Sequence, residues 1–347
     1  MPPRWRLPLL VLGVVSLAFG VAGGLARLVP SLNVYPSAIA LHGPLMVSAF
    51  FGTVIALERA VALDRLWAYA APLGAGLGGF FLLLGITSLG FFSMVMGAAV
   101  FCIASAVIFA RQPSLEMGTL LGGGVAWLAG NVLLFFGLAA VPWWIAFFAL
   151  TIGGERLELS RYLKRGPWVR TSFMLLAVAV LISPLIPGVM GAVLALLALW
   201  LLAFDLARIT VKQAKLPRYV AVCLLAGYFW LAIGGSLMAA ATSYDAALHA
   251  IFVGFVFSMV FGHAPVILPA VLRVRFPYHP VLYAPLVLLH ASLAARVLGG
   301  FLPEGSVLLK VGAWGNAAAI ALFILTAATL VLSRASSDRL KRSSPGR

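Results

Sequence analysis

Residues 246–268 read AALHAIFVGFVFSMVFGHAPVIL, which is 23 residues without an Asp, Glu, Lys or Arg. At about 1.5 Å per residue, a helix of this length crosses a hydrocarbon core of about 30 Å. The whole chain shares this character, because 63% of its 347 residues are hydrophobic and only 10% are charged. A water-facing surface needs more charge than that. The sequence therefore predicts a polytopic membrane protein.

The same length rule finds apolar runs along the whole chain, and we expect an all-α fold of about twelve transmembrane helices. The predicted domains are a single transmembrane domain over 1–333 and a basic, disordered cytoplasmic tail over 334–347. The first run resembles a signal peptide but exceeds the usual core of about 7–15 residues, which favours an uncleaved helix over a cleaved leader. The runs are 7–28, 37–57, 69–89, 91–110, 117–138, 142–157, 169–186, 189–204, 219–241, 246–268, 281–297 and 307–332.

The basic residues alternate with the predicted spans. Of the 24 Lys and Arg residues, 21 lie at the two ends of the chain or after even-numbered spans, which predicts cytoplasmic termini in a bacterial-type inner membrane. The outer face keeps only Arg27, Arg296 and Lys310. The net charge of +15 is thus spread over short loops beside the bilayer, whereas nucleic-acid binding needs one basic surface. We expect a lipid bilayer as partner and no nucleic acid.

Short internal matches suggest a repeat. His42 and His249 both follow a leucine near the start of an apolar run, and residues 53–59 (TVIALER) resemble residues 151–156 (TIGGER). These matches make the second, sixth and tenth helices counterparts, so that twelve helices form three pseudo-equivalent arcs of four. Glycines four residues apart are predicted to let helices approach closely, in the pairs Gly20/Gly24, Gly74/Gly78 and Gly118/Gly122.

Three histidines share a depth near the predicted outer face. His42 and His249 lie about 9 Å and 6 Å inside the boundary at about 1.5 Å per residue, and His290 reaches a comparable level. An imidazole in hydrocarbon is costly and has a partner. Each ring therefore either hydrogen-bonds a neighbouring helix or ligates a metal, and the pair His42/His249 matches the two axial ligands of a haem.

The twelve spans, the cytoplasmic termini and the outer histidines of helices two and ten resemble subunit I of haem-copper oxidases and the related NnrS family. This resemblance implies a haem b with His42 and His249 as axial ligands, and propionates held by Arg27 and Arg296. It further implies a role in nitric oxide or respiratory stress handling, with a redox partner or a small gas molecule. The sixth and seventh spans contain no histidine and Ile251 replaces a second ligand. We therefore expect no haem-copper oxygen-reducing centre, and a second metal, copper or iron, has no matching ligand set.

Ionisable residues also gather near the predicted cytoplasmic ends of helices two, six and ten, namely Glu58, Glu155, Glu158 and His263. One interpretation is an interfacial salt-bridge network with Arg59, Arg156 and Arg161. The other is a hard-metal or proton-relay site. The second interpretation supports a competing function, a proton- or ion-coupled secondary transporter. The sequence leaves open whether the protein is an enzyme.

Overall fold

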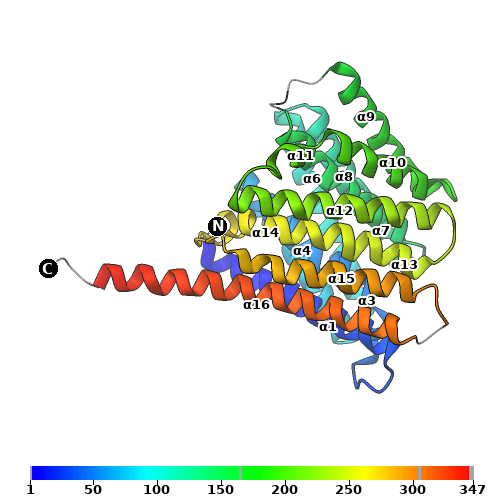
Figure 1. The fold of residues 1–347 in the computed structure, drawn as a ribbon, viewed down its shortest axis with the longest axis horizontal. Helices are drawn as coiled ribbons and strands as arrows, with labels where there is room; N and C mark the ends of the chain where they lie inside the picture. Colours follow the sequence, from blue (N-terminus) through cyan, green and yellow to red (C-terminus); the bar gives the residue numbers. More distant parts are fainter. Residues whose placement is uncertain (1, 162, 164–165, 304–305, 344–347) are drawn as a thin grey trace. The chain divides into compact units, whose positions relative to one another are not determined.

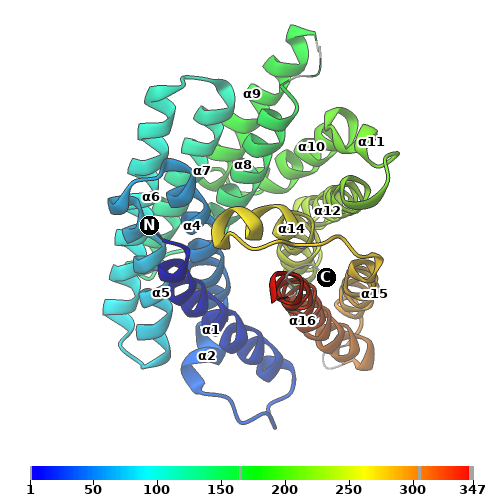
Figure 2. The same ribbon diagram turned by 90° about the vertical axis from the view of Figure 1, so that its left-hand side faces the viewer.

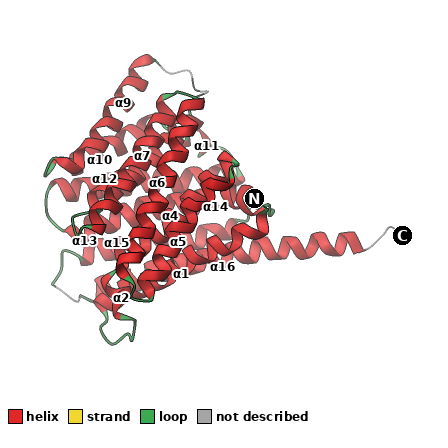
Figure 3. Ribbon diagram, turned by 180° about the vertical axis from the view of Figure 1, so that it is seen from behind, coloured by secondary structure: helices red, strands yellow, loops and turns green. Residues whose placement is uncertain are grey.

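Helices make up the architecture, and no strand occurs among residues 2–161, 163, 166–303 and 306–343, which are those described by the computed structural model (Figure 3). Each of the twelve predicted spans coincides with a helix. Helices are expected because backbone N–H and C=O groups in hydrocarbon find no water and must pair within their own segment. The all-α prediction is confirmed.

Ten helical stretches in the described part of the chain are long and apolar enough to cross a membrane. The two other predicted spans coincide with α8 (Val141–Leu159) and α10 (Val189–Phe204). Three charged residues, Glu155, Arg156 and Glu158, lie in the last turns of α8. With 16 residues, α10 is short for a full crossing.

The chain divides into two compact units, residues 1–197 and 198–347, and the division falls within α10. The sequence predicted one transmembrane domain over 1–333. Helices in each unit pack mainly on neighbours in the chain, so contacts thin out at this point. Besides the first part of α10, the first unit contains α1 (Pro3–Leu28), α2 (Pro36–Ala40), α3 (His42–Pro44), η1 (Leu45–Phe51), α4 (Gly52–Leu63), η2 (Leu66–Tyr69), α5 (Ala70–Leu83), α6 (Thr87–Arg111), α7 (Leu115–Phe135), α8, α9 (Pro167–Ile182) and η3 (Ser183–Leu185).

The second unit consists of the rest of α10 and the helices that follow it (Figure 1). Its last helix, α16, continues to Ser343, so residues 334–343 are helical where the sequence predicted a disordered tail, and residues 344–347 lie outside the described part. Its other elements are α11 (Ala207–Thr210), α12 (Lys215–Ala239), α13 (Tyr244–His249), η4 (Ala250–Phe257), α14 (Ser258–Leu272), η5 (Pro280–Leu282), α15 (Tyr283–Gly299) and α16 (Val307–Ser343).

Glycines set the spacing between α5 and α6, which lie side by side (Figure 2). A Cβ on Gly74 would come within 2.9 Å of the Gly97 backbone, and one on Gly78 within 2.9 Å of the Gly90 carbonyl oxygen. Any larger residue would push these backbones apart. The predicted close approach is confirmed for this pair. The prediction is wrong for Gly118 and Gly122. An added Cβ at these two positions would lie 3.5 and 3.6 Å from its nearest atom, which is ordinary contact.

The two units contain the same order of elements around their histidines. In each, a long helix (α1 or α12) is followed by a short helix, a histidine and a π-helical segment, η1 or η4. An α-helix then ends in a left-handed residue, and a 3₁₀ turn leads into the next helix. This order agrees with the predicted equivalence of the second and tenth helices. The sixth span, α8, is α-helical throughout and lacks this feature.

Candidate functional site

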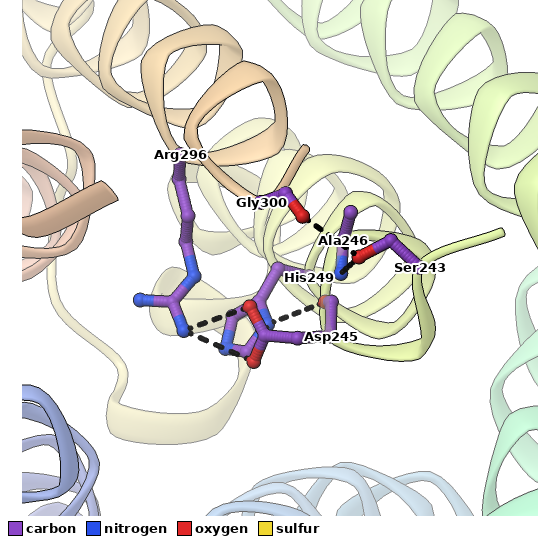
Figure 4. Close-up of polar contacts among 6 residues, drawn as sticks. All are labelled: Ser243, Asp245, Ala246, His249, Arg296 and Gly300. Carbon is purple, nitrogen blue, oxygen red and sulfur yellow. Dashed lines mark hydrogen bonds and ion pairs between the residues drawn. The ribbon is translucent and has the colours of Figure 1, made fainter. Parts of the chain in front are cut away.

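His249 ends the short helix α13 and points its ring back along that helix (Figure 4). Its Nδ1 lies 2.8 Å from the carbonyl oxygen of Asp245 and 3.2 Å from the Oδ1 of the same residue. A carbonyl oxygen only accepts hydrogen bonds, so Nδ1 carries the proton. Nε2 of the neutral ring then holds the lone pair. An imidazole fixed in this way is prepared to bind a metal through Nε2.

Arg296 on α15 is buried and pairs with the same aspartate. Its Nη2 donates to both carboxylate oxygens of Asp245, each at 3.3 Å (Figure 4). A buried guanidinium needs such a counter-ion, because an unpaired charge in low dielectric is costly. The Nε–H of Arg296 is buried without an acceptor among the described residues. One donor of this arginine is therefore open to an anionic group.

Ser243 links α13 to the end of α15. Its hydroxyl accepts the Ala246 N–H at 3.4 Å as the N-cap of α13 and lies 3.5 Å from the carbonyl oxygen of Gly300 (Figure 4). Capping satisfies an N–H that the first helical turn leaves unpaired. The link holds the Asp245 end of α13 beside α15.

His42 is the first residue of the short helix α3 in the first unit. Its Nδ1 lies 2.6 Å from the carbonyl oxygen of Gly20 on α1, so this ring also donates through Nδ1 and keeps its lone pair on Nε2. The ring rests on Gly24, where an added Cβ would lie only 2.7 Å from Cε1. The predicted close approach is confirmed at Gly24, because no larger residue fits beside this imidazole, whereas an added Cβ on Gly20 would meet the Met46 side chain, with Sδ at 2.8 Å.

Arg27, at the end of α1, binds the segment that precedes His42. Its Nε donates to the Ile39 carbonyl oxygen at 2.9 Å, and its Nη2 donates to that of Ala40 at 3.2 Å. These carbonyls lie at the end of the short helix α2, where no following helical turn supplies N–H donors to them. Arg27 thus positions the backbone next to His42 and uses only part of its five donors in doing so.

His290 on α15 uses both ring nitrogens in hydrogen bonds. The Nε1–H of Trp230 donates to its Nδ1 at 3.0 Å, which places the His290 proton on Nε2, 3.5 Å from the Ser258 hydroxyl oxygen. The indole of Trp230 packs on Gly254 in η4, where a Cβ would lie 2.5 Å from it. The contacts favour the hydrogen-bonding role for His290 over the ligand role.

The inner carboxylates Glu58, Glu155 and Glu158 belong to the first unit and His263 belongs to the second. Glu155 interacts electrostatically with Arg59, Arg156 and Glu158. This agrees with the predicted salt-bridge network. Nδ1 of His263 donates to the Met259 carbonyl oxygen at 2.7 Å, one turn earlier on α14. Glu58 lies on α4, one turn from its end.

No group of three or more His, Cys, Asp or Glu residues lies close enough to hold a metal ion in the described part of the chain. Asn131 on α7 makes interhelical hydrogen bonds: it accepts from the Trp144 indole N–H at 3.1 Å and donates to the Met94 carbonyl oxygen at 3.2 Å. It also accepts from the Ser48 hydroxyl in η1.

Sequence reasoning missed a second charged site in the first unit. Glu116 and Arg170 form a two-pronged ion pair, with N–O distances of 2.9 and 3.3 Å. The pair borders a cavity of about 300 Å³ between the ends of α6 and α8 and the starts of α7 and α9. Glu116 follows a helix-capping serine in sequence, Ser114, a signal that places a carboxylate at a helix start.

Residues 6–332 match the model of a family described as a domain of unknown function, DUF8744. The chain belongs to this family. No curated protein matches the chain. The matched region contains all twelve predicted spans, and a shared fold does not by itself establish a function.

Proposed function

We propose that this DUF8744 protein is a haem-binding integral membrane protein of the NnrS or haem-copper-oxidase-like kind, with His42 and His249 as axial ligands. The observation that carries the proposal is the matched setting of the two rings. Each donates its Nδ1 proton to a main-chain carbonyl and each is followed, within three residues, by a π-helical segment. Such segments are rare and concentrate at functional sites.

The residues around both rings fit a haem. Ligating histidines normally donate their other ring N–H to a carbonyl or carboxylate, which fixes the tautomer and raises the basicity of the ligating nitrogen. His249 has both kinds of acceptor from Asp245. Arg296 has a buried Nε–H that is open to a carboxylate. Arg27 has donors beyond those that hold α2, so both arginines are suited to propionates.

A haem b, if held by the His42 and His249 imidazoles, would supply a redox-active iron suited to electron transfer or sensing. The chain's own residues set the properties of that site. Asp245 and the main-chain carbonyls would orient both rings by accepting from Nδ1, and Arg296 offsets the carboxylate charge of Asp245. We therefore propose a role in electron transfer or in sensing nitric oxide or respiratory stress, with a redox partner or small gas molecule.

The distribution of Lys and Arg supports a location in a bacterial inner membrane with both termini in the cytoplasm. In that orientation His42 and His249 lie near the periplasmic face. A periplasmic or membrane-dissolved reductant would then have the shortest path to the haem.

The test is the absorption spectrum of the full-length protein purified in detergent after expression with added haem. We expect a Soret band and sharp visible bands on reduction, with non-covalent haem released by acid extraction. His42→Ala and His249→Ala should each lose the six-coordinate spectrum while the protein still inserts and elutes as one species. Glu155→Gln is the matched control and should keep the spectrum. Absence of haem from the wild-type protein would overturn the proposal.

The competing proposal is a proton- or ion-coupled secondary transporter that uses Glu58, Glu155, Glu158 and His263. The observation in its favour is the set of interacting charges around Glu155, which is located within a predicted membrane span. Intramembrane charges of this kind commonly couple transport to protons. Proton uptake by proteoliposomes, abolished in Glu155→Gln and unaffected in His249→Ala, would favour this function over haem binding.

A further inference from the structure

The cavity beside Glu116 and Arg170 lies at the level where spans end. Arg111 closes α6 and Leu115 opens α7, while α8 ends at Leu159. In the orientation proposed above, this end faces the cytoplasm. The cavity of about 300 Å³ would then lie at the level of lipid headgroups. Its walls are Gln112, Pro113, Ser114, Glu116, Met117, Glu158, Arg161 and Arg170.

The cavity offers both signs of charge. Arg170 uses two of its five N–H groups on Glu116, and its side chain is 48% exposed, so it has donors left for an anion. Arg161 brings a second guanidinium to the same wall. Two arginines beside one cavity are suited to a phosphate, because guanidinium groups bind its oxygens in pairs.

Glu158 gives the same cavity a place for a cation. It lines the cavity and interacts with Glu155, a second carboxylate one helical turn earlier. Like charges at this spacing destabilise each other, so a cation beside Glu158 would be favoured. The ideal cation is one with N–H donors, since a carboxylate is an acceptor only.

We propose that this cavity binds the headgroup of a phospholipid with a primary ammonium, of the phosphatidylethanolamine class. The phosphate pairs with Arg161 and Arg170, and the ammonium donates to Glu158. Pro113 and Met117 supply apolar surface for the glycerol end. A choline headgroup has the same phosphate but no N–H to donate. It would therefore pair with Arg161 and Arg170 but form no hydrogen bond with Glu158. Soluble phosphoethanolamine derivatives have the same charges, and the test separates them from the lipid.

The experiment measures lipid binding to the full-length, detergent-solubilised protein by native mass spectrometry. Dioleoyl phosphatidylethanolamine should bind about tenfold more tightly than dioleoyl phosphatidylcholine, because one charge-assisted hydrogen bond separates them. Glu158→Gln should abolish this preference and leave phosphatidylcholine binding unchanged. Arg161→Gln should weaken both lipids to a similar extent, because both have the phosphate.

Two controls remove the same charges elsewhere on the same predicted face. Asp64→Asn and Arg65→Gln, both in the connection after α4 and away from the cavity lining, should leave the preference intact. Equal binding of the two lipids by the wild-type protein would overturn the proposal. So would tighter binding of phosphatidylglycerol, since the site would then recognise anions alone. Saturation by glycerophosphoethanolamine without competition from the intact lipid would show a soluble ligand and refute the lipid.

Discussion

Substitution of Gly24 by alanine tests the position of His42 directly. The added Cβ would lie 2.7 Å from Cε1, 2.9 Å from Nδ1 and 3.3 Å from Nε2 of the imidazole. Ordinary contact begins at 3.4 Å, so the ring must retreat by about 0.7 Å. Movement of that size stretches its 2.6 Å bond to the Gly20 carbonyl toward the limit of a hydrogen bond.

The energetic balance follows from two opposing terms. Forcing an extra methyl group into a packed contact costs about 1–3 kcal/mol. Alanine in place of glycine in a helix interior returns about 1 kcal/mol. Gly24→Ala should therefore destabilise the protein by up to about 2 kcal/mol and displace His42 from its fixed orientation.

The assay is the reduced-minus-oxidised spectrum of haem-loaded protein, combined with a thermal inactivation curve. We expect a diminished or altered six-coordinate spectrum and earlier inactivation in Gly24→Ala. Gly122→Ala is the matched control, because its nearest atoms lie at 3.6 and 3.8 Å and it should gain helix propensity at no steric cost. If both variants behave alike and keep the wild-type spectrum, the placement of His42 against α1 is wrong.

Three further predictions concern the ion pair of Arg296, the role of His290 and the membrane orientation. Asp245→Asn removes the counter-ion of buried Arg296 and should cost less than the about 3–5 kcal/mol of a fully buried pair, because the Asp245 side chain is 53% exposed; the lower inactivation temperature should be partly restored in the double variant with Arg296→Met. His290→Ala should keep the haem spectrum, because its ring nitrogens already bind protein groups; loss of the spectrum would make it a ligand. Reporter fusions after Lys215 and after Arg339 should both report cytoplasm, and a periplasmic signal at either would refute the predicted orientation.

The apolar runs and the low charge of the sequence were sufficient to predict the helical architecture. The twelve apolar runs became helices because an isolated segment in hydrocarbon has no other way to pair its backbone. The tail was predicted less well. Residues 334–343 are polar and basic, yet they continue α16, since a long preceding helix removes the cost of starting a new one.

The contacts of the candidate site were predicted only in part. Depth singled out His42 and His249 as candidates, but the ion pair of Arg296 with Asp245 was not predicted, although Asp245 precedes His249 by one turn on the same helix. The i, i+4 spacing of Asp245 and His249 was sufficient to predict their contact. The ion pair of Glu116 with Arg170 could not be predicted from sequence spacing, because the two residues are 54 positions apart and meet only through tertiary packing.

The π-helical segments η1 and η4 change the angular phase of the helices that contain them. Each π-type hydrogen bond encloses one residue more than an α-helical bond, and an α-helix turns about 100° per residue. Side chains on either side of such a segment therefore face directions that a uniform 3.6-residue count assigns wrongly. Ser48 within η1 thereby reaches Asn131 and Trp127, while His42 before it remains against α1. The change of phase at η1 thus lets one continuous helix contact α1 before the segment and α7 within it.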